Sequence, residues 1–105
     1  MTSFDERENA FEAEFAHREQ LKFKVRARAV AFLARWAAQR LGKAGDATET
    51  YVREIIASDV ADPRQEATFE HIAADLAQVG VTQQEVRRAE EQFLAQAVAS
   101  VQASA

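Results

Sequence analysis

The chain has 105 residues, which is the size of one small domain. It contains no cysteine, so disulfides, thiolate catalysis and cysteine-ligated metal sites are excluded, and a reducing compartment is favoured. No apolar run approaches the roughly 20 residues of a membrane span, and the acidic first residues are not expected to form a secretory signal. With 3 glycines and 1 proline, a turn-rich β protein and a glycine-rich phosphate loop are both disfavoured.

The net charge of −4 is unevenly distributed along the chain. Residues 1–16 carry −4, residues 17–43 carry +7, and residues 44–105 carry −7. Acids before bases along the first 43 residues complement the dipole of one long helix. The basic middle of that segment is expected to attract the acidic remainder of the chain.

Residues 4–41 are predicted to form the first helix. Ser3 and Glu6 have the spacing of a capping box, and Gly42 is placed to end the helix. Its apolar residues follow three-four spacing, as expected for a buried helical face: Leu21, Val25, Ala29, Phe32, Leu33, Trp36 and Leu41. A continuous helix here would be about 57 Å long, and the other three only about 20–30 Å, so its first 15 to 20 residues must overhang, bend back or be disordered.

Three further helices are predicted from their caps. Asp46 and Glu49 cap the second, Asp62-Pro63 opens the third, and Thr82 opens the fourth after Gly80. Their apolar residues also recur at three-four spacing: Tyr51, Val52, Ile55 and Ile56; Phe69, Ile72, Ala73, Leu76 and Val79; Val86, Phe93, Leu94, Ala97, Val98 and Val101. Val81 and Val86 are spaced as a hydrophobic staple. Because the loops are short, at 42–46, 58–62 and 80–82, we expect an all-α, up-down four-helix bundle with a long first helix and a mobile N-terminal arm.

The aromatic residues of the arm do not continue the seam of the bundle. Phe4, Phe11 and Phe15 fall within about 40° of one another on a helix, on a line rotated by about 70° from the Leu21–Trp36 line. An aromatic stripe without a place in the core is a candidate partner-binding face. The alternative is that this segment folds back and caps the bundle.

No motif in the chain specifies catalysis or a metal site. Glu14 and His17 form an E-x-x-H pair, but a di-iron bundle needs a second such pair, and His71 has Thr68 at the corresponding position. His71 is expected at the edge of the bundle. Gly42-Lys43 lacks the rest of a phosphate loop. We therefore expect no catalytic residue, no metal and no enzymatic activity.

A nucleic-acid partner is also disfavoured. The basic residues between Arg18 and Arg28 do not share one helical face, and the whole chain is acidic. We expect these bases to belong to a solvated helix that pairs with acidic neighbours.

The sequence resembles a known family in three blocks. Residues 4–17 fit the pattern F-D-x-R-E-x-A-F-E-x-x-F-A-H, Glu19-x-Leu21-x-Phe23-Lys24 follows, and Trp36-Ala37-Ala38 leads to Leu41-Gly42. These patterns are similar to those of the zeta inhibitor subunit of alphaproteobacterial F-type ATP synthases. The C-terminal half is similar more loosely, at Phe69, Ala74 to Leu76 and Gly80-Val81. The chain departs from the family pattern at Arg18 and in the stretch from Arg26 to Val30.

The resemblance implies an inhibitor of ATP hydrolysis. Residues 1–16 would be the inhibitory arm and residues 17–105 the four-helix bundle that anchors it. The arm would insert into the catalytic head, among the alpha, beta and gamma subunits, and block rotation. Its partner-binding residues would be Phe4, Asp5, Glu6, Arg7, Glu8, Phe11, Glu12 and Phe15.

The resemblance also implies a location and a weak ligand. The protein would be cytoplasmic, associated with the membrane-bound synthase without inserting into the membrane. Weak adenine-nucleotide binding is implied for the family, with no site located in this sequence and no other cofactor expected. The alternative function is a generic helical interaction module that binds another partner through its N-terminal aromatic stripe.

Overall fold

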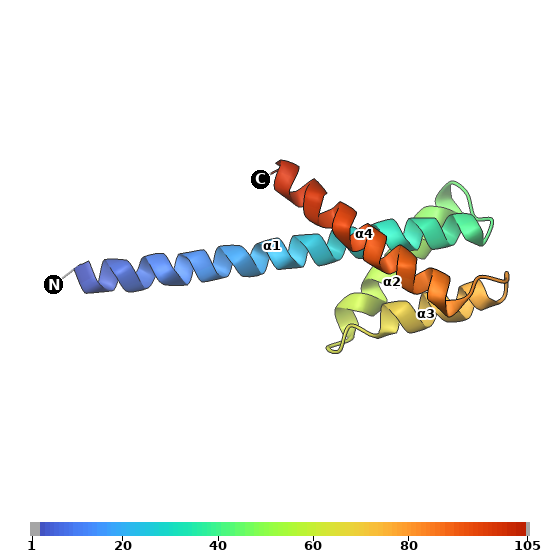
Figure 1. Ribbon diagram of the computed structural model, residues 1–105, viewed down its shortest axis with the longest axis horizontal. Helices are drawn as coiled ribbons and strands as arrows, with labels where there is room; N and C mark the ends of the chain where they lie inside the picture. The colour runs from blue at the N-terminus through green and yellow to red at the C-terminus, as the bar shows by residue number, and fades with distance from the viewer. Residues whose placement is uncertain (1–2, 105) are drawn as a thin grey trace.

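The computed structural model of the chain describes the backbone of residues 3–104 and the side chains of residues 12–104. Four helices make up this part of the chain, without a strand: α1 (Ser3–Arg40), α2 (Asp46–Ala61), α3 (Ala67–Ala77) and α4 (Gln83–Ser104). The predicted all-α, four-helix architecture with a long first helix is therefore confirmed. The molecule measures 64 × 27 × 25 Å because α1 spans its whole length, with the other helices gathered around the C-terminal half of α1 (Figure 1).

Two of the helix ends lie where glycine predicts them. Gly42 and Gly80 have φ values of 76° and 82°, in the left-handed region that glycine adopts without strain. The amide of the next residue then bonds back into the last turn, Lys43 to the Ala38 carbonyl at 2.9 Å and Val81 to the Leu76 carbonyl at 3.0 Å. These turns send the chain back along the bundle.

The predicted start of α4 is confirmed, whereas the predicted start of α2 is wrong. At α4 the Glu85 amide donates to Thr82 Oγ1 at 3.1 Å, and Val81 and Val86 are both buried, so the cap is confirmed and the staple residues lie as expected. At α2 the predicted cap by Asp46 is wrong. Gly45 occupies the cap position without a side-chain bond, and its carbonyl accepts the amides that begin the helix.

The boundary between α2 and α3 also differs from the prediction. The second helix continues to Ala61, and α3 begins at Ala67 rather than at Pro63. The Asp62 carboxylate accepts the backbone amides of Arg64 at 3.1 Å and of Glu66 and Ala67 at 2.7 Å. This carboxylate therefore satisfies donors at the start of α3 from a turn outside the helix, and Pro63 lies within that turn.

The hydrophobic core lies where α1 meets the other three helices. Its buried members come from all four helices and the turn before α4: Val30, Leu33, Ala34, Ala37, Ala38, Tyr51, Val52, Ile55, Phe69, Ile72, Ala73, Leu76, Val81, Val86 and Ala89. Ala34, Ala37 and Ala38 have no exposed surface, because small side chains let helices approach closely. Phe93 packs against Phe32 and Trp36, with ring centroids 6.3 and 6.4 Å apart.

Three residues predicted for the core are exposed instead. Val79 lies in the turn after α3, which ends at Ala77. Leu94 and Val98 are 46% and 38% exposed. Ala97 and Val101 in the same half of α4 are buried, so only one side of its apolar face is covered where α4 crosses α1 (Figure 1).

Candidate interaction surface: the projecting helix and its root

The N-terminal part of α1, residues 3–20, projects from the bundle and is here called the projecting segment (Figure 1). Every described side chain in it, from Glu12 to Gln20, is exposed. Among the described side chains of α1, the first that is half-buried is Leu21. The overhang that the length of the helix predicts is therefore confirmed for residues 12–20, and here the segment extends away from the bundle instead of folding over it.

Local chemistry explains why this segment is helical without tertiary contacts. It contains neither glycine nor proline and is rich in alanine and glutamate, which are good helix formers. Glu14 and Arg18, one helical turn apart, form an ion pair with 3.9 Å between their charged atoms. Lys22 and Glu19 form another at 3.3 Å. Each exposed pair contributes only a few tenths of a kcal/mol. The helix here is held by weak local terms, so it can adjust to a binding surface at small cost.

Two of the predicted partner-binding side chains lie in the described part of the segment. Glu12 is exposed, and Phe15 is 58% exposed with no core contact. Such an aromatic side chain is a suitable anchor for a partner. The side chains of the others lie outside the described residues: Phe4, Asp5, Glu6, Arg7, Glu8 and Phe11.

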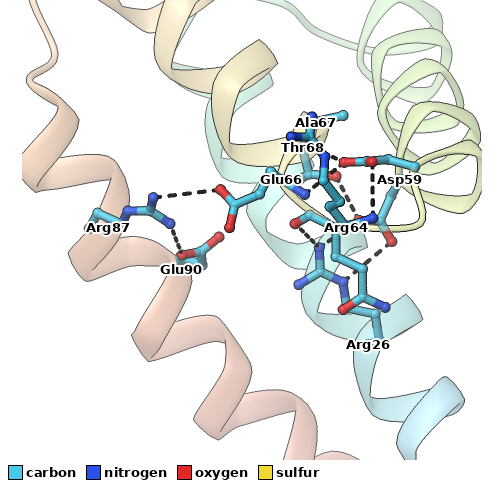
Figure 2. Close-up of polar contacts among 10 residues, drawn as sticks. Arg26, Asp59, Arg64, Glu66, Ala67, Thr68, Arg87 and Glu90 are labelled. Carbon is cyan, nitrogen blue, oxygen red and sulfur yellow. Dashed lines mark hydrogen bonds and ion pairs between the residues drawn. The ribbon is translucent and has the colours of Figure 1, made fainter.

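At the root of the segment, α1 is fixed to the bundle by a polar cluster (Figure 2). The Asp59 carboxylate on α2 accepts from Arg26 Nη2 at 2.5 Å, from Arg26 Nε at 3.3 Å, and from the Thr68 hydroxyl at 2.8 Å. Arg26 also donates to the Gln65 carbonyl at 3.3 Å. Asp59 and Thr68 are buried, and every buried polar side-chain atom among the described residues has a partner. One cluster thus joins α1, α2, α3 and the turn between α2 and α3.

The basic pattern of the sequence does not single out this cluster, because Arg26 is one of several basic residues on α1. The expected pairing with acidic neighbours is confirmed for Arg26. A signal was nevertheless present in the sequence. Asp59 lies four residues after Ile55, and Arg26 four residues before Val30, so both charges continue buried apolar stripes. A charge on such a stripe indicates a buried partner.

On its other side, the root borders α4. Leu21 and Val25 of α1 face Leu94, Val98 and Val101 of α4 across a groove of about 380 Å³, here called the root groove. Lys22, Arg26 and Gln102 also line it. On the same pair of helices, Arg28 donates to the hydroxyls of Ser100 at 2.7 Å and Ser104 at 3.5 Å. The two helices are therefore bonded at the root while an apolar groove stays open between them.

A second polar cluster lies in the bundle away from the root. The Tyr51 hydroxyl donates to Asp75 Oδ2 at 2.9 Å, and His71 Nε2 lies 3.3 Å from the same oxygen. Burial, with the Asp75 carboxylate beside the hydroxyl, raises the pKa of Tyr51 well above its ordinary value. His71 is half-buried at the edge of the bundle, as predicted.

A third set of contacts joins α4 to the start of α3. Arg87 lies 3.0 Å from Glu90 and 4.0 Å from Glu66 (Figure 2). Its guanidinium also stacks 3.4 Å above the centre of the Phe69 ring. These side chains are paired with one another, so we interpret the contacts as stabilising the packing of α4 against α3.

The described residues also bear on metal binding and on membrane insertion. Among the side chains of residues 12–104, no three from His, Asp or Glu are grouped as a metal ion would require, and Glu14 and His17 are both exposed on the projecting segment. No helix in the same part of the chain is long and apolar enough to cross a membrane.

Comparison with known proteins gives one match. Residues 1–100 match the family described as ATPase inhibitor subunit zeta. The match includes the projecting segment, its root and nearly all of the bundle. Neither the curated proteins nor the solved structures contain a significant match.

Proposed function

The chain belongs to the ATPase inhibitor subunit zeta family, and from this premise we propose that it blocks ATP hydrolysis by inserting residues 1–16 into the catalytic head of an F-type ATP synthase. Residues 17–105 are the proposed anchoring domain, whose helices from Leu21 onward form the bundle that holds this arm. Its binding partners in the head are the alpha, beta and gamma subunits, and the protein works in the cytoplasm at the membrane-bound synthase.

The exposed projecting segment is the observation that carries this proposal. It is a helix with an exposed aromatic side chain, Phe15, and with acidic side chains that include Glu12 and Glu14. An apolar helical face docking in a groove gains affinity from aromatic anchors, and the surrounding charges speed encounter and fix register. Because α1 is one continuous helix, the position of the bundle also fixes the position of the arm.

Inhibition of this kind requires no catalytic group on the inhibitor. A rotary enzyme must change conformation at each catalytic step, and a helix held between the moving parts opposes that change. The blocked state is stabilised by the difference between binding to the stopped conformation and binding to the next one. The proposed role of the bundle is to keep the arm from being expelled.

The test is inhibition of ATP hydrolysis by the isolated catalytic head. The full chain should inhibit, and a variant lacking residues 1–14 should not. Because the side chains from Glu12 to Gln20 are exposed, the truncated protein should keep the helical circular dichroism and urea midpoint of the bundle. Full inhibition by the truncated protein would sink the proposal.

A matched pair of substitutions locates the anchor. Phe15→Ala should raise the concentration for half-inhibition about tenfold or more, as expected for an aromatic anchor. Val79→Ala removes a comparably exposed apolar side chain, 49% against 58%, far from the segment and should have no effect. Equal potency of these two variants would mean that Phe15 is not an anchor. A generic interaction module with another partner would be favoured if the full chain does not inhibit the head and a pull-down recovers no synthase subunit.

A further inference from the structure

We propose that the root groove is a second docking surface, which receives an amphipathic helix with acidic flanks from the same ATPase. This inference rests on the proposed function, because it assigns the partner to the enzyme that the arm enters. It adds a contact made by the bundle itself, beside the arm.

The shape of the root groove fits a helix. Its two walls are themselves helices, which cross each other (Figure 1) and are joined by Arg28 to Ser100 and Ser104. Its floor is apolar, made by Leu21 and Val25 on one wall and by Leu94, Val98 and Val101 on the other. A groove between two helices with an apolar floor is a standard receptor for the apolar face of a third helix.

Charge selects an acidic partner. Of the five bases among residues 18–28, Lys22 and Arg26 line the root groove, and Arg26 is already paired with Asp59. Lys22 lines the root groove, and its described ionic contact is an exposed one to Glu19 at 3.3 Å, which solvent weakens. On the α4 wall, residues 92–104 contain no charged side chain. A partner helix with carboxylates along the edge facing α1 would therefore gain favourable charge interactions on that side and meet no charge on the α4 wall.

The exposed apolar side chains are concentrated at this end of the molecule. Among the described residues, six large apolar side chains are exposed, and five lie on the projecting segment or around its root: Phe15, Phe23, Val60, Leu94 and Val98. Val79 is the exception, at the turn between α3 and α4. Leu94 and Val98 line the root groove, and Phe23 and Val60 line a neighbouring hollow, so exposed apolar side chains near charged ones gather where a partner of the projecting segment would lie.

The position of the root groove favours the ATPase over other occupants. It begins at Leu21, where the projecting segment leaves the bundle, so a protein that encloses the segment also faces the groove. A nucleic acid is disfavoured because the floor is apolar and the chain is acidic overall.

Substitutions on the α4 wall test the inference without changing the arm. The double variant Leu94→Gln and Val98→Gln replaces partly exposed side chains, so the bundle should stay folded by circular dichroism. It should raise the half-inhibition concentration for the isolated catalytic head at least tenfold while reaching the same inhibition at saturation. Val79→Gln, at the opposite end, is the control and should match the wild-type protein.

A charge reversal supplies an independent test that does not touch the floor. Lys22→Glu should raise the half-inhibition concentration at least threefold at low salt, with a smaller effect at high salt, because exposed charges are screened. Arg88→Glu is its control, since Arg88 is exposed on the first half of α4. This variant carries the test if the double variant does not fold.

The outcomes separate this inference from the proposed function. A wild-type protein that does not inhibit would refute the proposed function. A wild-type inhibitor whose potency the root-groove variants leave unchanged would refute this inference alone. If sedimentation equilibrium shows that the wild-type protein is a dimer and the double variant a monomer, the groove is assigned to a second copy of the chain. Stronger inhibition by the double variant would assign it to the chain's own arm.

Discussion

The polar cluster at the root of the projecting segment gives the most direct test of what holds α1 to the bundle. Asp59→Ala removes the acceptor of three hydrogen bonds, two from Arg26 and one from Thr68. Breaking a buried ion pair by removing one partner typically costs about 3–5 kcal/mol. The Thr68 residue is only 1% exposed, so its hydroxyl would lose its described partner away from bulk water.

Two features of the site reduce this cost. The Arg26 side chain is 28% exposed, so water can solvate much of its charge after the substitution. Alanine is also a better helix former than aspartate by about 0.5 kcal/mol. The expected loss of unfolding free energy is therefore about 2.5 kcal/mol, which corresponds to a fall in Tm of about 10–20 °C for a domain of this size.

Urea unfolding followed by far-UV circular dichroism measures the effect. Glu19→Ala is the matched control, since it removes an exposed carboxylate paired at 3.3 Å with Lys22 and should change stability by less than about 0.5 kcal/mol. A double-mutant cycle of Asp59→Ala with Arg26→Ala should give a coupling of about 1–3 kcal/mol. If Asp59→Ala behaves like the control, or the coupling is near zero, the cluster does not anchor α1.

Two further predictions concern pH. Tyr51→Phe should cost about 1 kcal/mol at neutral pH through loss of the bond to Asp75. The raised pKa of Tyr51 stabilises the fold fully below the ordinary tyrosine value near 10, and this contribution is lost as pH rises above it. Unfolding by urea between pH 8 and 11 should therefore show a steeper alkaline loss for the wild-type protein than for Tyr51→Phe. The Asp62 carboxylate accepts the amide of Ala67, and its pKa is lowered by that bond first and by the Arg64 amide next. Its contribution to stability is present above the ordinary value of 3.8 and is lost as pH falls below it. Asp62→Asn should accordingly flatten the acid limb of the stability profile between pH 5 and 2, and an unchanged limb would contradict this assignment.

Local chemistry determines much of the fold from the sequence. The number of helices, the ends at Gly42 and Gly80, and the Thr82 cap follow from interactions within a few residues, so they can be predicted without tertiary information. The overhang of α1 also follows, because helix length is fixed by residue count and the other helices are too short to cover it. The motif block assigns the family, which the match over residues 1–100 confirms.

Some functional expectations from the sequence stay predictions. The boundary of the arm at residue 16, its mobility, the weak binding of an adenine nucleotide, and the contact roles of Phe4 to Phe15 are among them. The described structure places Glu12 and Phe15 on an exposed helix, which is compatible with such contacts. What these side chains touch depends on the partner and not on this chain alone.

Tertiary structure decided the pairing of Arg26 with Asp59, which lie 33 residues apart. Sequence spacing shows that each charge lies on a buried stripe, but only the packing of α1 against α2 brings the two together. The same holds for the root groove. Leu94 and Val98 follow the apolar period of α4, yet they are exposed while Ala97 and Val101 are buried. Which side of this face is covered depends on the angle at which the helices cross, and that angle is set by how their side chains interlock. Local sequence therefore specified the helices, and long-range packing specified which apolar residues remain available to a partner.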